Sequence, residues 1–188
     1  MNWSWIPNAI TVTRVVASLP LLWLLMRGDY VPAFWLAVVA GASDALDGII
    51  AKQFGWQSVL GGILDPIADK LLLSVCFFGL WWNLYLPTWL VVLVLALDVV
   101  ILVGAFAWWR LLGAFNPEPS GISKVTTASQ LLLVGLVLAH LAGHDFALTW
   151  HAPLMLATAG VTVVSGVDYV VRYGARARVS MTVGGGFV

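Results

Sequence analysis

The sequence predicts an all-α, polytopic integral membrane protein with six transmembrane helices. Of its 188 residues, 61% are hydrophobic and 10% are charged, and the mean hydropathy is +0.96. Soluble domains are instead about half apolar and a quarter charged. Nearly charge-free runs of about 17 to 25 residues recur along the chain, the length at which a helix crosses a hydrocarbon core about 30 Å thick. Because backbone groups in lipid must be paired within their own segment, these runs should be helices.

Six apolar runs define the predicted spans in order. They cover residues 9–26, 31–51, 66–86, 89–111, 126–141 and 153–171. The intervening segments 53–64 and 114–123 carry Gly, Pro and Ser residues, which are typical of turns, so we expect both to be cytoplasmic loops. Residues 1–179 should form one six-helix domain, and the tail 180–188, SMTVGGGFV, should be disordered.

The distribution of Lys and Arg predicts how the helices are oriented, because cytoplasmic loops of membrane proteins are enriched in both. With the N-terminus in the cytoplasm, the outward loops hold only Arg27. The inward loops and the C-terminal tail hold Lys52, Arg110, Lys124, Arg172, Arg176 and Arg178. Both termini should therefore be cytoplasmic. The N-terminus lacks the basic start and cleavage site of a secretory signal, so the first apolar run should be kept as a span.

Charge and cysteine content exclude two classes of function. Nine basic residues balance nine acidic ones, so the chain has no basic field to attract nucleic acid. The single cysteine, Cys76, lies in an apolar run. It can form neither an internal disulfide nor a multi-cysteine metal site.

Asp44, Asp47, Asp65 and Asp69 lie at or near the inward ends of the second and third predicted spans. A carboxylate at the membrane centre costs roughly 2.5 to 3.5 kcal/mol, so these side chains must meet water or cations. Spacings of three and four residues place each pair on one face of its helix. Glycines between the pairs leave room for a close approach of backbone or ligand.

Four carboxylates around one cavity repel each other unless cations neutralise them. Mg²⁺ and Mn²⁺ prefer oxygen ligands, and two divalent ions would balance four negative charges. Paired cations suit phosphoryl transfer, so the pattern predicts lipid synthesis at a membrane face. Taken singly, Asp65 before Pro66 has the alternative of a helix cap, and Asp69 beside Lys70 that of surface solvation. A small cation-coupled transporter could also carry acidic residues, but they would follow a path through the membrane.

Residues 44–69 read DALDGIIAKQFGWQSVLGGILDPIAD, which is D-x2-D-G-x2-A-K-x8-G-x3-D-x3-D. This resembles the signature of the CDP-alcohol phosphatidyltransferases, integral membrane enzymes that transfer a phosphatidyl or related group from a CDP-linked donor to an alcohol and release CMP. Lys52 stands where the family pattern has Arg. Residues 6–20 also resemble the family's opening segment, with Asn8, Thr11 and Arg14 in the expected order.

The resemblance implies roles for particular residues. It implies that Asp44, Asp47 and Asp65 bind one metal ion, and that Asp44, Asp65 and Asp69 reach a second. Asp69 would also be the general base that takes the proton from the acceptor hydroxyl. The predicted contacts of the substrates are Gly48, Ala51 and Gly61 around CMP, Lys52 and Thr11 at its polar groups, and the inward cations Arg14, Arg110 and Lys124. Homodimers are common in the family, so a homodimer is one expectation.

The acceptor alcohol is less closely defined by the sequence. Residues 116–134 resemble the corresponding segment of eukaryotic-type cardiolipin synthases, which join CDP-diacylglycerol to phosphatidylglycerol, but phosphatidylglycerophosphate synthases carry a related pattern. Asp98 and Arg110 are spaced as in cardiolipin synthases, although Leu97 stands where both kinds usually have Arg. A phosphate-monoester acceptor such as glycerol 3-phosphate should need more cations than this chain offers. We therefore expect phosphatidylglycerol as the acceptor, with glycerol 3-phosphate as the alternative.

Overall fold

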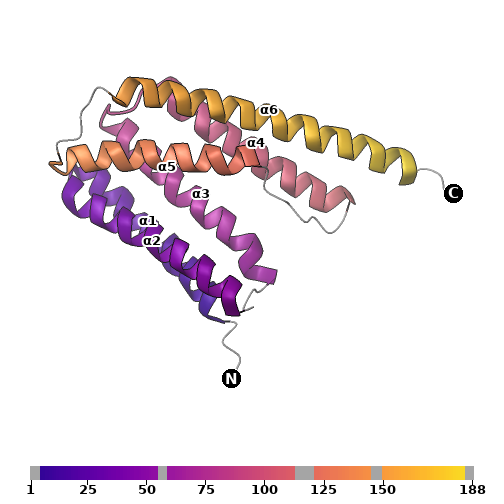
Figure 1. The fold of residues 1–188 in the computed structure, drawn as a ribbon, viewed down its shortest axis with the longest axis horizontal. Coiled ribbons are helices and arrows are strands. Elements are labelled where there is room, and N and C mark those ends of the chain that lie inside the picture. The colour runs from indigo at the N-terminus through magenta and orange to yellow at the C-terminus, as the bar shows by residue number, and fades with distance from the viewer. Residues whose placement is uncertain (1–4, 55–58, 113–120, 145–149, 185–188) are drawn as a thin grey trace. The chain divides into compact units, whose positions relative to one another are not determined.

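A computed structural model describes residues 5–54, 59–112, 121–144 and 150–184. Side chains are described for residues 12–43, 68–104, 121–144 and 150–172. The described ranges form six helices and contain no strand, which confirms the all-α prediction (Figure 1). The helices are α1 (Trp5–Arg27), α2 (Tyr30–Phe54), α3 (Val59–Trp82), α4 (Thr88–Leu112), α5 (Gly121–Leu141) and α6 (His151–Gly184).

Two stretches in the described part of the chain are long and apolar enough to cross a membrane, Gly121–Leu141 and His151–Arg172. The apolar stretches Tyr30–Ser43 and Thr88–Gly104 are shorter. Many large apolar side chains are not covered by protein, such as Leu19 at 69% and Leu156 at 66% exposure. Soluble monomers rarely expose contiguous apolar surface on this scale, so the helices suit a lipid environment. The six-span topology remains a prediction.

The helices extend furthest beyond the predicted spans at three places. The segment 53–64 was expected to be a loop, but α2 continues to Phe54 and α3 begins at Val59. Apolar residues flank the glycines of this segment, and a glycine costs a helix only about 1 kcal/mol. α5 begins at Gly121, five residues earlier than predicted. α6 ends at Gly184, past the start of the tail expected to be disordered, because residues 173–183 contain no proline and only one glycine to interrupt the helix.

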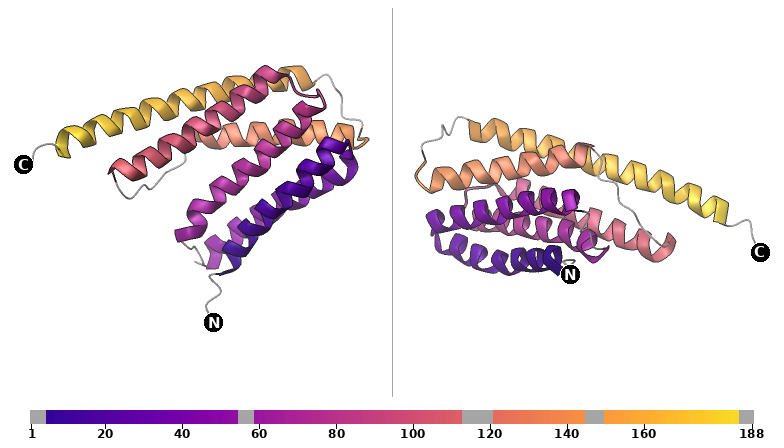
Figure 2. Two further views of the ribbon diagram at one scale, coloured as in Figure 1. Left: turned by 180° about the vertical axis from the view of Figure 1, so that it is seen from behind. Right: turned by 60° about the horizontal axis from the view of Figure 1, so that its bottom comes forward.

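The chain forms two compact units, residues 1–88 with 131–151 and residues 89–130 with 152–188. In the first unit, α1 packs along both α2 and α3, as the views in Figure 2 show. Leu21 and Leu25 of α1 are fully buried. A Cβ atom at Gly79 of α3 would lie 2.6 Å from the Leu25 Cβ, so only glycine permits this approach. Asn83 Nδ2 donates to the Leu25 carbonyl at 2.8 Å and ties the C-terminal ends of α1 and α3 together.

The turn after α1 shows how the sequence ends this helix. Gly28 has a φ of +79°, a conformation that glycine adopts without strain. The Gly28 amide donates to the Leu25 carbonyl at 3.1 Å, and the Asp29 amide donates to the Leu24 carbonyl at 3.0 Å. These bonds form a glycine C-cap that satisfies the last carbonyls of α1. The chain then reverses directly into α2, which places the second helix beside the first.

In the second unit, α4 packs against α6 through small residues. A Cβ atom at Gly166 would lie 2.4 Å from Leu97 Cδ2, so Leu97 occupies the space that a side chain at position 166 would need. The Tyr169 hydroxyl donates to the Ile101 carbonyl at 3.0 Å, beside Gly104. Small residues and interhelical hydrogen bonds are the usual means by which helices associate in lipid.

Buried hydroxyl and amide groups fix α5 on α6 in the same unit. Gln130 Nε2 donates to Thr162 Oγ1 at 3.2 Å, and the Thr126 hydroxyl donates to the Val161 carbonyl at 3.3 Å. The Thr158 hydroxyl donates back to the Ser129 carbonyl at 3.4 Å. These three bonds set the antiparallel register of α5 and α6.

Candidate active site

The four predicted aspartates lie on two consecutive helices. Asp44 and Asp47 are in the second half of α2, and Asp65 and Asp69 are in the first half of α3. The linking residues 55–58 can separate the two helix ends by at most about 18 Å. The side chains of Asp44, Asp47 and Asp65 lie outside the described residues. That the four carboxylates meet therefore stays a prediction.

Asp69, the predicted base, is held by an arginine from another helix. Arg14 Nη1 of α1 donates to Asp69 Oδ1 of α3 and forms an ion pair with it. The Arg14 side chain is 4% exposed and that of Asp69 is 42% exposed. The cation is thus buried, while the carboxylate is partly accessible from outside the protein. The structure shows this pairing of Arg14, and its predicted contact with a substrate stays a prediction.

The sequence itself indicates that Arg14 needs a partner of opposite charge. Arg14 is the only charged residue within the first predicted span, and an intramembrane cation requires a partner. Asp69 is 55 residues away along the chain. Only the packing of α1 on α3 identifies it as that partner.

Arg14→Gln is expected to lower both the stability of the fold and the turnover of substrate. Removing one partner of a fully buried ion pair costs about 3–5 kcal/mol. Because Asp69 is partly exposed, we expect roughly 1–2 kcal/mol here. Arg14→Lys keeps the positive charge and should retain more of both properties. Thermal unfolding in detergent and product formation measure the two effects.

Arg27→Gln on the same helix serves as the matched control. Arg27 Nε lies 3.9 Å from Asp29 Oδ2, and both side chains are at least half exposed. Exposed pairs of this kind contribute about 0–1 kcal/mol. Equal losses of stability in Arg14→Gln and Arg27→Gln would contradict a special role for the Arg14–Asp69 pair.

The other predicted substrate contacts fall mostly where side chains are not described. Thr11 lies on α1, Gly48, Ala51 and Lys52 on α2, Gly61 on α3 and Arg110 on α4, all with side chains outside the described residues. Lys124 is described and is exposed near the beginning of α5. These assignments stay predictions.

Two further acidic residues are described in the second unit. Asp98 of α4 is 8% exposed and is therefore buried, as its position within a predicted span suggested. Asp168 accepts a hydrogen bond of 2.6 Å from Arg172 Nε, one helical turn later on α6. A spacing of four residues places the two side chains on one face of α6, which allows this local ion pair.

Comparison with known proteins assigns the family. Residues 4–164 match the family model described as CDP-alcohol phosphatidyltransferase. The matched stretch contains the residues 44–69 motif and Arg14. The chain belongs to the CDP-alcohol phosphatidyltransferase family. The resemblance drawn from the spacing of the aspartates is thereby confirmed.

Relatives within the CDP-alcohol phosphatidyltransferase family bear two kinds of name. Cardiolipin synthase (CMP-forming) of Rattus norvegicus is 35% identical over 150 residues, covering 71% of this chain and 50% of that protein. CDP-diacylglycerol--glycerol-3-phosphate 3-phosphatidyltransferase 1, chloroplastic, of Oryza sativa subsp. japonica is 31% identical over 186 residues, covering 89% of this chain and 56% of that protein. The probable phosphatidylglycerophosphate synthase of Mycobacterium tuberculosis is 32% identical over 173 residues, covering 88% and 79%. This chain spans about half the length of the rat and rice relatives.

CDP-alcohol phosphatidyltransferases generally use divalent metal ions. Among the described side chains, no three His, Cys, Asp or Glu residues gather around one point. Asp69 is the one predicted ligand in that set, and its partly exposed carboxylate is the oxygen donor that Mg²⁺ or Mn²⁺ prefers. The donor chemistry therefore fits the metal ions of the family.

Proposed function

We propose that this chain transfers the phosphatidyl group of CDP-diacylglycerol to the free glycerol hydroxyl of phosphatidylglycerol, which yields cardiolipin and CMP. The observation that carries the proposal is the family match over residues 4–164, which includes the aspartates of α2 and α3 in the spacing of the motif. Residues 1–179 would form the catalytic membrane domain, with six spans and with both termini and the active site in the cytoplasm. Two copies could associate as a homodimer.

In the proposed reaction, the acceptor hydroxyl attacks the phosphorus atom that bears the diacylglycerol. Asp69 takes the hydroxyl proton, a new P–O bond forms to the acceptor, and the bond from phosphorus to the oxygen that bridges to CMP breaks. CMP leaves with that oxygen. Arg14 would help to orient the Asp69 carboxylate, since it binds Oδ1 and is itself buried.

The remaining aspartates would hold the metal ions, whose positive charge would reduce the repulsion between the carboxylates. Asp44, Asp47 and Asp65 are the proposed ligands of one ion, and Asp44, Asp65 and Asp69 those of a second. When bound, two divalent cations supply charge stabilisation for the leaving phosphate and lower the pKa of an attacking hydroxyl. Lys52, Thr11 and the small residues Gly48, Ala51 and Gly61 would line the nucleotide pocket.

The pairing of cations supports a phosphodiester acceptor. Glycerol 3-phosphate carries a phosphate monoester, which is bound most strongly by several cations together. Of the basic residues expected near the inward face, Arg14 is paired with Asp69 and Arg172 with Asp168. These pairs reduce the net positive charge available to a dianion. A phosphodiester with a single negative charge places a smaller demand on the site.

Phosphatidylglycerophosphate synthesis is the second candidate, because the rice and mycobacterial relatives align with 89% and 88% of this chain. An activity assay distinguishes the two functions. It uses purified protein in bilayers with CDP-diacylglycerol and Mg²⁺ or Mn²⁺. Phosphatidylglycerol and glycerol 3-phosphate are supplied in separate reactions, and CMP release and the lipid product are measured. Cardiolipin that depends on phosphatidylglycerol is the expected product. Product from glycerol 3-phosphate alone would reject cardiolipin synthesis in favour of the second candidate.

A further inference from the structure

Two histidines lie at the junction between α5 and α6. His140 is in the last turn of α5, and His151 is the first residue of α6. Both belong to the first compact unit of the chain. The two rings are close enough that positive charges on both would repel each other. The antiparallel arrangement of the two helices therefore brings a pair of imidazoles together at this end.

Each histidine of this pair has one ring nitrogen that is buried. His140 Nδ1 and His151 Nε2 have no hydrogen-bond partner among the residues that the structure describes. His140 follows the buried residues Leu133 and Val137 at helical spacing, which places it on the buried face of α5. An unpaired buried nitrogen costs free energy, and in native proteins such an atom often marks a bound ion or water. The two nitrogens therefore call for a common ligand.

The chemistry of the two nitrogens favours a transition-metal ion. A neutral imidazole has one nitrogen lone pair, which a metal ion can bind. Zn²⁺, Cu²⁺ and Ni²⁺ suit imidazole ligands, whereas Mg²⁺ and Mn²⁺ suit carboxylates. In the described part of the chain, no three His, Cys, Asp or Glu residues gather around one point, so the protein supplies two ligands and water supplies the others. The histidine pair thus prefers other metals than the aspartates of α2 and α3 do.

We propose that His140 Nδ1 and His151 Nε2 together bind one imidazole-preferring transition-metal ion, such as Zn²⁺, which joins the end of α5 to the start of α6. The ion has a structural role. Its two ligands come together only when α5 lies along α6, so binding stabilises the folded helix pair by mass action. In the predicted topology this junction faces outward, on the other side of the membrane from the four aspartates. The site does not depend on which acceptor alcohol the enzyme uses.

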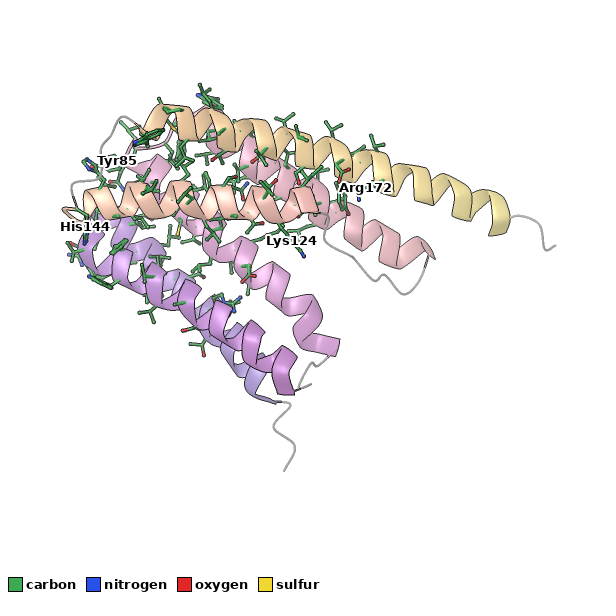
Figure 3. The ribbon with its side chains drawn as sticks, in the orientation of Figure 1. Tyr85, Lys124, His144 and Arg172 are labelled. Atoms are coloured by element: carbon green, nitrogen blue, oxygen red, sulfur yellow. The ribbon has the colours of Figure 1, made fainter. Side chains whose placement is uncertain are left out.

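The third histidine of the chain, His144, offers a matched control. Figure 3 shows it just beyond the end of α5. Its Nδ1 atom lies 3.2 Å from the Ala139 carbonyl oxygen, and its ring lies against Phe34 of α2 with 5.4 Å between the ring centroids. His144 is exposed, whereas the ring nitrogens of the proposed site are buried. We therefore expect the ion to bind without it.

Thermal unfolding of tag-free, metal-stripped protein in detergent tests the site, with excess Mg²⁺ present to occupy the aspartates. Zn²⁺ at about a hundred times its dissociation constant should raise the Tm of the wild type by roughly 5–10 °C. His140→Phe and His151→Phe each keep an aromatic ring but lose the metal ligand, so each should lose this rise. His144→Phe should keep it. Because the two test variants alter different helices, the test remains decisive if one of them does not fold.

Cu²⁺ provides a second readout that does not depend on stability. The wild type should bind one Cu²⁺ per chain at this site, and the electron paramagnetic resonance spectrum should show hyperfine splitting from two imidazole nitrogens. In His140→Phe or His151→Phe the splitting should come from one nitrogen at most, and the affinity for Cu²⁺ should fall. His144→Phe should give the spectrum of the wild type.

Several results would overturn the metal site. A wild-type Tm that Zn²⁺ leaves unchanged would exclude the ion and indicate water as the ligand of the two nitrogens. An equal rise in the wild type, His140→Phe and His151→Phe would place the ion elsewhere. Loss of the rise in His144→Phe as well would contradict a site made by two histidines. A rise that occurs only without Mg²⁺ would assign the ion to the aspartates. None of these results would alter the proposed transfer reaction.

Discussion

Asp69→Asn is expected to lower turnover by about 10²- to 10⁴-fold while CDP-diacylglycerol still binds. The asparagine side chain keeps the size of aspartate and retains a carbonyl oxygen that can accept the hydrogen bond from Arg14. It cannot take up the proton of the acceptor hydroxyl. The α1–α3 packing should therefore survive the change better than the chemistry does. Cardiolipin formation, with donor binding measured separately, tests this expectation.

Asp29→Asn provides the control for this substitution. Asp29 is half exposed in the turn between α1 and α2, and its carboxylate lies 3.9 Å from the Arg27 Nε. The same chemical change at this position should leave turnover within about twofold, because surface substitutions usually cost under 0.5 kcal/mol. Turnover by Asp69→Asn close to that of Asp29→Asn would remove Asp69 from the role of base.

Asp44→Asn and Asp65→Asn are expected to abolish metal-dependent activity, with losses of at least about 10³-fold, because each residue is a proposed ligand of both ions. An amide oxygen is a weaker ligand than a carboxylate and adds no negative charge. The wild-type protein should bind Mn²⁺ in a titration followed by electron paramagnetic resonance, and both variants should bind it more weakly. Unchanged Mn²⁺ affinity together with normal turnover would exclude the two residues as ligands.

Long apolar runs allowed the helical fold to be predicted from the sequence, since no other backbone conformation suits such runs in lipid. Helix boundaries were less predictable. The glycines near Gly61 were interpreted as a loop, yet α3 begins at Val59, because local propensity is a weak guide where helices pack. The motif of residues 44–69 gave the family correctly, since its spacing depends only on order along the chain.

Features that depend on the packing of distant helices could not be predicted in the same way. Arg14 and Asp69 are 55 residues apart, and their pairing requires the particular rotation of α1 against α3. The register of α5 and α6 likewise depends on individual hydrogen bonds, such as that between Gln130 and Thr162. Hydrophobic periodicity indicates which residues are apolar but contains no information about which helices become neighbours.

The contact of Leu97 with Gly166 makes these two positions evolutionarily dependent on each other. The resemblance to the family implies arginine as the usual residue at position 97, and the methyl groups of Leu97 occupy the volume that any side chain at position 166 would need. A longer residue at either position would push α4 away from α6. Homologous chains with arginine at position 97 should therefore differ from this chain in the packing around position 166 as well. The residues at the two positions are expected to vary together.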